Sequence, residues 1–343
     1  MRLSCDRPRA KPPGGGGGIR VWLCRCDHLT AGEAMAILVH VAPFPSELWI
    51  KALEKLVPEE HFVTLEEVTD PSDVRCVIIA HPPQGFLAEY RNLRMIGTVT
   101  AGVDRLVADP DLPPGVPIVR GGDPAGDAQI TENIILHVLR HHRQLPAYVA
   151  AQARAEWVRL DQKLAGDRRV GFLGLGIIAR PGAERIRDMG FQVAAWTRTP
   201  KDVAGIENFH GADGFAPFLA RSEIIVNLLP VTPATTDILD DEAFAALPQG
   251  AAVINLGRGE HVVDGDLMAA LESGHLSAAT LDVYRTEPLP AGNPLWRHPG
   301  ITLMPHCSRK ILPGGIVPQL AEGIRKTASG EMPANTVDLA AGY

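Results

Sequence analysis

Short apolar runs alternate with longer segments of helical period from Met35 to the end of the chain. This alternation constrains the fold most, because it is typical of strand–helix–strand units that build mostly parallel sheets. In the first part of the chain, strands are predicted at 35–41, 61–65, 74–80, 94–100 and 117–120. A second, more regular series is predicted at 168–174, 192–197, 223–229, 251–256, 277–284 and 301–306. We therefore expect an α/β fold with two domains, each built on a doubly wound parallel sheet.

The segments outside these series suggest how the chain is divided. A long amphipathic stretch at 127–153 is predicted as a helix that joins the two series. The last segment, 313–343, starts with helical period and has no strand left to join, so we expect it to pack back on the first series. Residues 1–34 combine arginines, prolines and a run of five glycines. This composition is too poor in periodic apolar residues to add to a core, and we expect a disordered leader.

Composition excludes several classes of protein. The chain has 33 Lys and Arg against 40 Asp and Glu, a formal net charge of -7, and no local basic stripe. Such a charge does not favour nucleic acid or an anionic membrane, and no apolar run approaches the roughly 20 residues of a membrane-spanning helix. The five cysteines are scattered without metal-type spacings. We expect a cytoplasmic protein in a reducing compartment, with no disulfide and no metal site.

The first strand of the second series runs into Gly174-Leu175-Gly176-Ile177-Ile178-Ala179 and then a helix. In a phosphate-binding turn, the first glycine permits the tight bend and the second lets the backbone approach a pyrophosphate. The third position allows the helix to pack closely on the strand, and alanine is an accepted alternative there. The alternative is a purely structural glycine turn. Its place at the head of a six-strand series favours a dinucleotide site that includes Gly174, Gly176, Ile177 and Ile178.

The end of the next strand indicates which dinucleotide fits. Selectivity for NAD usually requires Asp or Glu there to hold the ribose hydroxyls, but this chain has Thr197, Arg198 and Thr199. A guanidinium and two hydroxyls suit an anionic 2′-phosphate better. We therefore predict NADP(H) in preference to NAD(H). The alternative is that Arg198 is a solvated loop residue.

Three residues capable of chemistry follow three consecutive strands of the second series. Arg258 comes just after 251–256, Glu287 just after 277–284, and His306 ends 301–306. Taken singly, each is more often structural than catalytic. The carboxyl ends of parallel strands line the ligand crevice of such a sheet, so we predict that the cation, the acid and the histidine face one site.

Long stretches of the sequence resemble the D-isomer-specific 2-hydroxyacid dehydrogenase family, most of all its bacterial glyoxylate/hydroxypyruvate reductase A branch. The motifs that carry the resemblance are "GFLGLG", "LLPVTPATTDIL", "AAVINLGRGEHVVDGDLMAALESGHLSAATLDVYRTEPLP" and "NPLWRHPGITLMPH". The resemblance covers roughly 35–343. It implies a Rossmann NAD(P)-binding domain at 123–307 and a smaller, flavodoxin-like substrate domain at 35–122 and 308–343. It also implies a homodimer, for which the segment 127–153 is the expected element.

The family's reaction is hydride transfer between a nicotinamide and C2 of a small 2-keto acid, here glyoxylate to glycolate or hydroxypyruvate to D-glycerate. Carried over by motif, Arg258 binds the substrate carboxylate and carbonyl, His306 donates the proton and Glu287 orients His306. A carboxylate beside an imidazole favours its protonated, acid form. The resemblance also assigns further residues. Ala101, Gly102 and Val103 are expected to hold the substrate carboxylate through backbone amides, Asp282 to lie near the nicotinamide amide, and Leu229, Pro230 and Gly257 to contact the cofactor.

The chain departs from the family pattern in three places. The sequence after His306 reads "CSRKILPGG", which puts Cys307, Arg309 and Lys310 near the expected substrate site. Thr100 precedes the carboxylate-binding loop, where glycine is more usual, and Arg180-Pro181 follow the phosphate turn at once. These changes leave two alternatives open: an NADP-binding regulatory protein with weak or no catalysis, and a dehydrogenase for another D-2-hydroxy acid.

A group of histidines on the predicted helix 127–153 offers one further candidate site. His137 and His141 have the spacing of a metal-binding pair, but no acidic ligand is placed to complete a site. We expect His137, His141 and His142 to lie on a helix surface or at a dimer contact.

Overall fold

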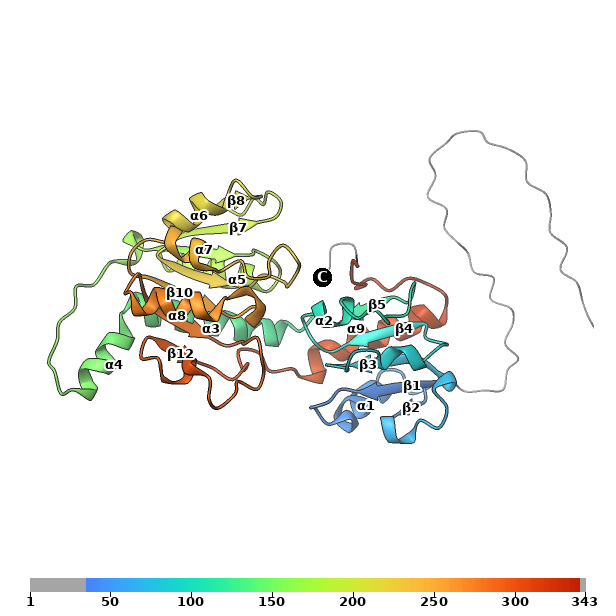
Figure 1. Ribbon diagram of the computed structural model, residues 1–343. Helices are drawn as coiled ribbons and strands as arrows, with labels where there is room; N and C mark the ends of the chain where they lie inside the picture. The colour runs from blue at the N-terminus through green and yellow to red at the C-terminus, as the bar shows by residue number, and fades with distance from the viewer. Residues whose placement is uncertain (1–34, 340–343) are drawn as a thin grey trace, which may run out of the picture. The chain divides into compact units, whose positions relative to one another are not determined.

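A computed structural model of the protein describes residues 35–339, which contain two parallel sheets (Figure 1). The first is five-stranded, in the order β2-β1-β3-β4-β5. Every neighbouring pair in it is parallel. The strands are β1 (Ala36–His40), β2 (Phe62–Val63), β3 (Val74–Ile79), β4 (Met95–Thr98) and β5 (Ile118–Arg120). This is the flavodoxin-like strand order, and all five predicted strands of the first series are present.

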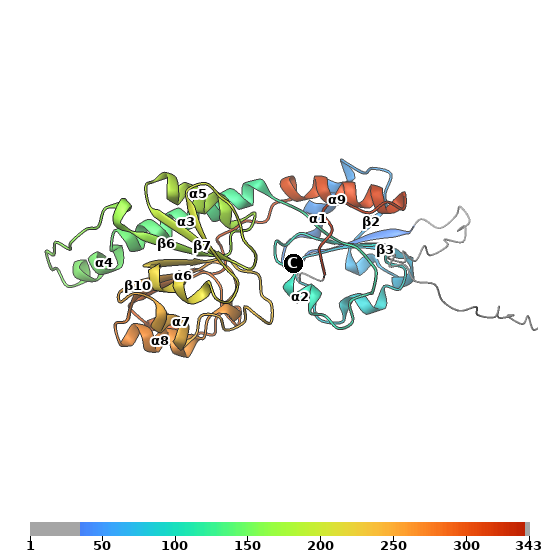
Figure 2. The same cartoon turned by 90° about the horizontal axis from the view of Figure 1, so that it is seen from above.

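Helix α9 (Pro313–Ala328), from the far end of the chain, covers this first sheet together with α1 (Ser46–Glu54). Figure 2 shows α9 and α1 side by side. Apolar residues of α9 are fully buried against β1, β3 and β4, among them Ile316, Leu320 and Ile324. Beyond α9, the amide of Val337 donates to the carbonyl of Ile118 at 2.8 Å, so the tail pairs with β5. The predicted return of the C-terminal segment is confirmed.

The second sheet is seven-stranded, in the order β12-β11-β10-β9-β6-β7-β8, and all its pairs are parallel. Its strands are β6 (Arg169–Leu173), β7 (Gln192–Thr197), β8 (Ile206–His210), β9 (Ile224–Asn227), β10 (Ala251–Asn255), β11 (Leu276–Leu281) and β12 (Ile301–Leu303). The order reverses between β6 and β9, which is the switch point where a dinucleotide-binding sheet opens its crevice.

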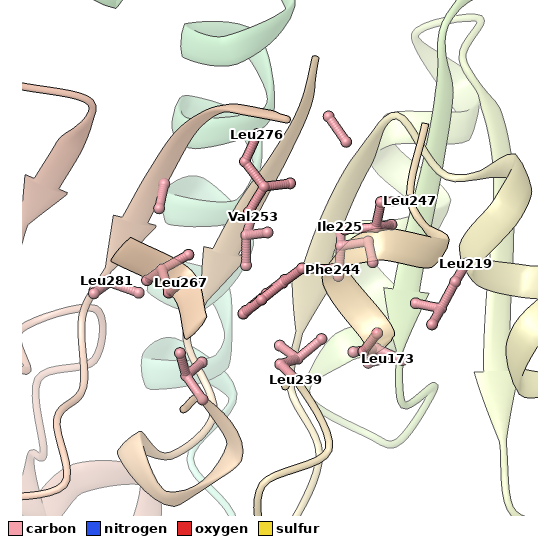
Figure 3. Packing of buried hydrophobic residues seen from close by; sticks show 14 of the residues in the cluster. Leu173, Leu219, Ile225, Leu239, Phe244, Leu247, Val253, Leu267, Leu276 and Leu281 are labelled. Carbon is pink, nitrogen blue, oxygen red and sulfur yellow. The ribbon is translucent and has the colours of Figure 1, made fainter. Parts of the chain in front are cut away.

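Helices bury apolar residues on both faces of this second sheet. One face is covered by α3 (Pro124–His142) and α5 (Ala179–Asp188), whose buried residues cluster with those of β6, β7 and β9. The other is covered by α6 (Phe215–Arg221), α7 (Asp241–Ala246) and α8 (Asp264–Glu272). Figure 3 shows Phe244 of α7 in the centre of this second cluster, between Val253 and Leu239. Burying a phenylalanine contributes roughly 1.5–3 kcal/mol.

Strand β8 was missed by the sequence analysis, which predicted six strands in this sheet. Its sequence, Ile206-Glu-Asn-Phe-His210, buries only Ile206 and lies at the sheet edge, so it lacks the continuous apolar run of an inner strand. Asn208 fixes it to the neighbouring strand by donating to the Ala195 carbonyl and to the Thr197 hydroxyl.

The predicted single helix at 127–153 was wrong, because the segment forms two helices. Helix α3 ends at His142 and α4 (Leu145–Ala153) starts after Gln144, which has a positive φ of 53°. Pro146 explains the break. A proline clashes with the carbonyl four residues earlier, here that of His142, and has no N–H to donate.

The histidines of α3 also differ from expectation. His137, His141 and His142 are buried, at 2%, 8% and 5% exposure, rather than on a surface. His141 Nε2 lies 2.9 Å from the Thr280 hydroxyl, and burial lowers its pKa to about 3, so this side chain is a neutral part of the core. Within 35–339, no group of three or more His, Cys, Asp or Glu is arranged to hold a metal ion.

None of the helices between 35 and 339 is long and apolar enough to cross a membrane. The expected leader, 1–34, and its cysteines Cys5, Cys24 and Cys26 lie outside the described residues. The predicted domain boundaries at 122 and 307 stay predictions.

Candidate active site

The loop after β10 carries Arg258 and is held by a buried polar network. Asn255, at the end of β10, donates to the Arg258 carbonyl at 2.8 Å and accepts from Asn227 at the end of β9 at 2.9 Å. The ring of His261 accepts from the Arg258 amide at Nδ1 and reaches the Pro230 carbonyl at Nε2. His261 is fully buried, and burial lowers its pKa to about 4. A neutral imidazole with one donor and one acceptor nitrogen therefore fixes this loop.

Gly259 brings the Arg258 loop against the end of β11. A Cβ on Gly259 would lie 1.9 Å from the backbone of Tyr284, closer than any side chain tolerates. Because only glycine fits, the loop that carries Arg258 packs directly on the segment that leads to Glu287. The sequence "GRGEH" had indicated Arg258, but not this contact.

Glu287 and His306 form a hydrogen-bonded pair. His306 Nδ1 lies 2.7 Å from Glu287 Oε2, and the other carboxylate oxygen accepts from the Tyr284 amide at 2.9 Å. The His306 side chain is about half exposed and that of Glu287 a quarter exposed. Nδ1 is therefore committed to the carboxylate, and Nε2 is the ring nitrogen left to meet a ligand.

Burial and hydrogen bonding act in opposite directions on Glu287. Burial raises the pKa of its carboxyl, whereas the hydrogen bonds from His306 and from the Tyr284 amide lower it. The lowering prevails, with help from the charge of Arg105, so the pKa lies below its ordinary value of 4.5. Glu287 is ionised at neutral pH and keeps its acceptor role toward His306.

The turn that presents His306 is strained and is held by Asp282. His306 has a φ of 50°, a left-handed conformation that costs a non-glycine residue roughly 1–2 kcal/mol. Its amide donates to the Asp282 carbonyl at 2.8 Å, and the Asp282 carboxylate accepts from the amides of Cys307 at 2.8 Å and Ser308 at 3.1 Å. These bonds, each contributing about 1 kcal/mol or more, offset the strain. The expected contact of Asp282 with the nicotinamide amide stays a prediction.

Arg258 contacts an acidic partner, from the short helix after β4, that sequence reasoning missed. Its Nη2 lies 3.1 Å from Oδ1 of Asp104, the first residue of the short helix α2 (Asp104–Val107). Its Nε lies 3.3 Å and 3.4 Å from the two carboxylate oxygens, and Nη1 donates to the Gly257 carbonyl at 2.9 Å. An aspartate beside a glycine loop has no distinctive sequence signal, because aspartate is equally common as a residue that caps a helix.

The expected carboxylate-binding loop lies against this guanidinium. A Cβ on Gly102 would fall 1.5 Å from Arg258 Nη2, so only glycine allows the approach. Thr100 is buried and donates to the Gly102 carbonyl at 2.9 Å, which braces the loop. Ala101 and Gly102 are partly exposed, whereas Val103 is buried in the first sheet's core. The amides of these three residues remain the predicted carboxylate donors.

The phosphate turn has the geometry that a dinucleotide needs. Gly174 has a φ of 89°, which requires glycine, and Gly176 has nothing within 4 Å of the place a Cβ would take. Ile177 is 79% exposed, and α5 starts at Ala179 with Pro181 in its first turn, where a missing N–H costs little. The turn therefore leaves open space above Gly176 for a phosphate to approach the backbone, and the residues fit the predicted cofactor.

Other predicted cofactor residues surround the same sheet edge. Arg198 and Thr199 are exposed after β7, whereas Thr197 is buried and donates its hydroxyl to the Thr199 carbonyl at 2.8 Å. Thr197 therefore shapes the loop from within. Leu229, Pro230 and Gly257 lie beside the His261 network.

Arg309, expected near the substrate site, is paired elsewhere. Its Nη2 lies 3.4 Å from Oδ1 of Asp127 in α3, and its side chain is only 12% exposed. Cys307 and Lys310 are exposed. The Arg309 ion pair therefore ties the segment that precedes α9 to α3.

Comparison with known proteins shows which family the sequence matches. Residues 135–308 match the model of the D-isomer specific 2-hydroxyacid dehydrogenase, NAD binding domain, family. A glyoxylate/hydroxypyruvate reductase A from Serratia proteamaculans is 37% identical over 315 residues, which are 90% of this chain and 100% of that protein. A reductase of the same name from Yersinia enterocolitica is 33% identical over the same shares.

Solved structures with the same fold hold a cofactor. A D-isomer specific 2-hydroxyacid dehydrogenase from Xanthobacter autotrophicus, in complex with NADPH and MES, matches with a TM-score of 0.85 and 38% identity, covering 90% of this chain and 100% of that one. An NADPH-dependent glyoxylate/hydroxypyruvate reductase from Sinorhizobium meliloti, in complex with NADP and sulfate, matches with a TM-score of 0.82 and 30% identity over the same shares.

The lowered pKa of Glu287 predicts how its contribution to stability depends on pH. A carboxyl whose pKa is lower in the folded state stabilises the fold above its unfolded pKa, and this stabilisation is lost as the pH falls through the folded value. We expect Glu287→Gln to lower the denaturant midpoint at pH 7, and the difference from the unaltered protein to shrink below about pH 4.5. Glu272→Gln, at an exposed carboxyl, controls for the lost charge. A difference that stays constant down to pH 3 contradicts this expectation.

Proposed function

Because the chain belongs to the D-isomer specific 2-hydroxyacid dehydrogenase family, we propose that it reduces glyoxylate and hydroxypyruvate with NADPH. The observation that carries the proposal is the hydrogen bond of His306 to Glu287, at 2.7 Å, with Arg258 on the neighbouring loop. A cation for the carboxylate and an oriented acid for the carbonyl oxygen are what reduction of a 2-keto acid requires.

Arg258 and the loop at 101–103 bind and orient the substrate. A guanidinium presents parallel N–H groups that match a carboxylate and an adjacent carbonyl oxygen. The backbone amides of Ala101, Gly102 and Val103 supply further donors for the carboxylate. The network of Asn255 and His261 holds the Arg258 backbone before the substrate arrives, so the loop itself needs no ordering in the binding step.

His306 supplies the proton. NADPH, when bound, supplies the hydride that C2 of the keto acid receives. Negative charge then develops on the carbonyl oxygen, and the proton on His306 Nε2 moves to it, which completes the 2-hydroxy acid. The imidazole is left neutral with its remaining proton on Nδ1, which donates a hydrogen bond to Glu287. Glu287 therefore keeps the ring in one orientation throughout the reaction.

The cofactor is assigned to the turn after β6 and the loop after β7. The backbone of Gly174, Gly176, Ile177 and Ile178 and the N-terminus of α5 suit the pyrophosphate. Arg198 and Thr199, both exposed, suit the 2′-phosphate that distinguishes NADPH from NADH. The solved relatives from Xanthobacter autotrophicus and Sinorhizobium meliloti hold NADPH or NADP, which supports this choice.

Large apolar side chains that are exposed in the second half of α3, in α4 and after α4 support a homodimer. Leu136, Leu145 and Val149 are 43–55% exposed, and Trp157 is 92% exposed. Exposed apolar side chains that gather in one region are typical of an interface. The partner we propose is a second copy of this chain. The two cysteines within 35–339, Cys76 and Cys307, are free thiols, in keeping with the proposed cytoplasmic setting.

We expect the purified protein to oxidise NADPH in the presence of glyoxylate or hydroxypyruvate, at a higher kcat/KM than with NADH. His306→Ala removes the acid, so kcat should fall about 10²- to 10⁴-fold while NADPH binding is retained. His61→Ala, at an exposed histidine just before β2, is the matched control. Bound NADPH without turnover of any small 2-keto acid refutes the proposal in favour of a binding or regulatory protein. If only a different 2-keto acid is turned over, the proposed reaction stands and the proposed substrate is wrong.

The homodimer is tested by mass in solution. Light scattering should give twice the chain mass of 36.8 kDa. The double variant Val149→Asp, Trp157→Ser should shift the protein toward the monomer, because the two changes remove exposed apolar area and add charge to the proposed interface. Met332→Ser, at an exposed methionine elsewhere, should not. A monomeric unaltered protein contradicts the proposal.

A further inference from the structure

We infer that Asp104 is a positioning residue that decides which edge of the Arg258 guanidinium meets the substrate. The inference rests on the proposed function and goes beyond it, because it gives a role in keto-acid recognition to a residue of helix α2 that does not touch the reacting atoms. The ion pair also joins the two sheets at the site, since Asp104 belongs to α2 and Arg258 follows β10.

The geometry of the pair is side-on. Asp104 accepts from both Nε and Nη2, the two nitrogens that share one edge of the guanidinium. On the opposite side, Nη1 donates to the Gly257 carbonyl at 2.9 Å. The guanidinium is thus held from two directions by a carboxylate and a backbone carbonyl.

Two N–H groups of the Arg258 guanidinium are left for a ligand. A guanidinium carries five N–H groups in a fixed, planar arrangement. Nε uses its single N–H on Asp104, Nη2 uses one there, and Nη1 uses one on Gly257. Between residues 35 and 339, no other acceptor is found for the Arg258 guanidinium. Each Nη therefore keeps one N–H group for a ligand, and N–H groups on the two Nη atoms of a guanidinium can bind two oxygens of a 2-keto acid side by side.

Burial stabilises the ion pair between Asp104 and Arg258. The Asp104 side chain is 14% exposed and that of Arg258 is 28% exposed, so water competes weakly for either partner. Gly102 leaves the guanidinium just enough room, since a Cβ there would lie 2.7 Å from Asp104 Oδ1 as well as 1.5 Å from Arg258 Nη2. A long arginine side chain without such partners would occupy several rotamers, and the productive one would have to be selected at each binding event.

Asp104→Asn tests the inference, because the amide keeps the size of the side chain but has one acceptor oxygen and no charge. We expect kcat/KM for glyoxylate to fall about 10- to 100-fold, as a displaced binding group does, while the Kd for NADPH stays within about twofold. Asp109→Asn is the matched control, because Asp109 accepts only from backbone amides of the same region.

A double-mutant cycle with Arg258→Lys separates positioning from mere structural support. If Asp104 acts through Arg258, Arg258→Lys should cost much less in the Asp104→Asn protein than in the unaltered one. Additive effects, or an Asp104→Asn protein with full kcat/KM, overturn the inference. Should Asp104→Asn not fold, Asp104→Glu makes the same test, since it keeps the charge and moves the carboxylate by one methylene. If the unaltered protein does not reduce keto acids, the proposed function is overturned as well. If the unaltered protein is active, a negative result concerns the role of Asp104 alone.

Discussion

The hydrogen bond between His306 and Glu287 is the interaction on which the rest of the site depends, because it decides which ring nitrogen is free to act. The end of β11 controls both partners. Glu287 is oriented by the Tyr284 amide, and Asp282 holds the strained turn of His306 through its carbonyl and its carboxylate. Without that carboxylate, the amides of Cys307 and Ser308 would lose their acceptor, at a cost of roughly 1–3 kcal/mol for each that stays buried.

The two sheets supply complementary parts of the site. The second sheet brings Arg258, Glu287 and His306 to one edge, because the carboxyl ends of β10, β11 and β12 lie there side by side. The first sheet supplies the glycine loop and Asp104. Burial is used selectively. His261 is kept neutral inside the protein, whereas the charged groups stay paired and partly exposed. A buried neutral imidazole costs far less than a buried charge, so it can support the loop without a counter-ion.

Much of this arrangement could be predicted from the sequence, because parallel strands leave strong local patterns. The apolar runs located all the inner strands, and the strand ends pointed to Arg258, Glu287 and His306. Strand β8 was missed because an edge strand exposes most of its residues. The break at Gln144 was missed although Pro146 stands two residues later. Asp104 and His261 were missed for a different reason: their roles arise from contacts between distant segments, and neither has a distinctive local sequence.

The proposed function places a 2-keto acid between the free edge of Arg258 and His306 Nε2. A crystal structure with NADP⁺ and oxamate, an unreactive analogue of a 2-keto acid, tests it most directly. We predict that oxamate oxygens contact Nη1 and Nη2 of Arg258, that Asp104 stays on Nε, and that the oxamate carbonyl oxygen accepts from His306 Nε2. Oxamate bound away from Arg258, or a His306 ring turned from Glu287 in the complex, would contradict this mechanism.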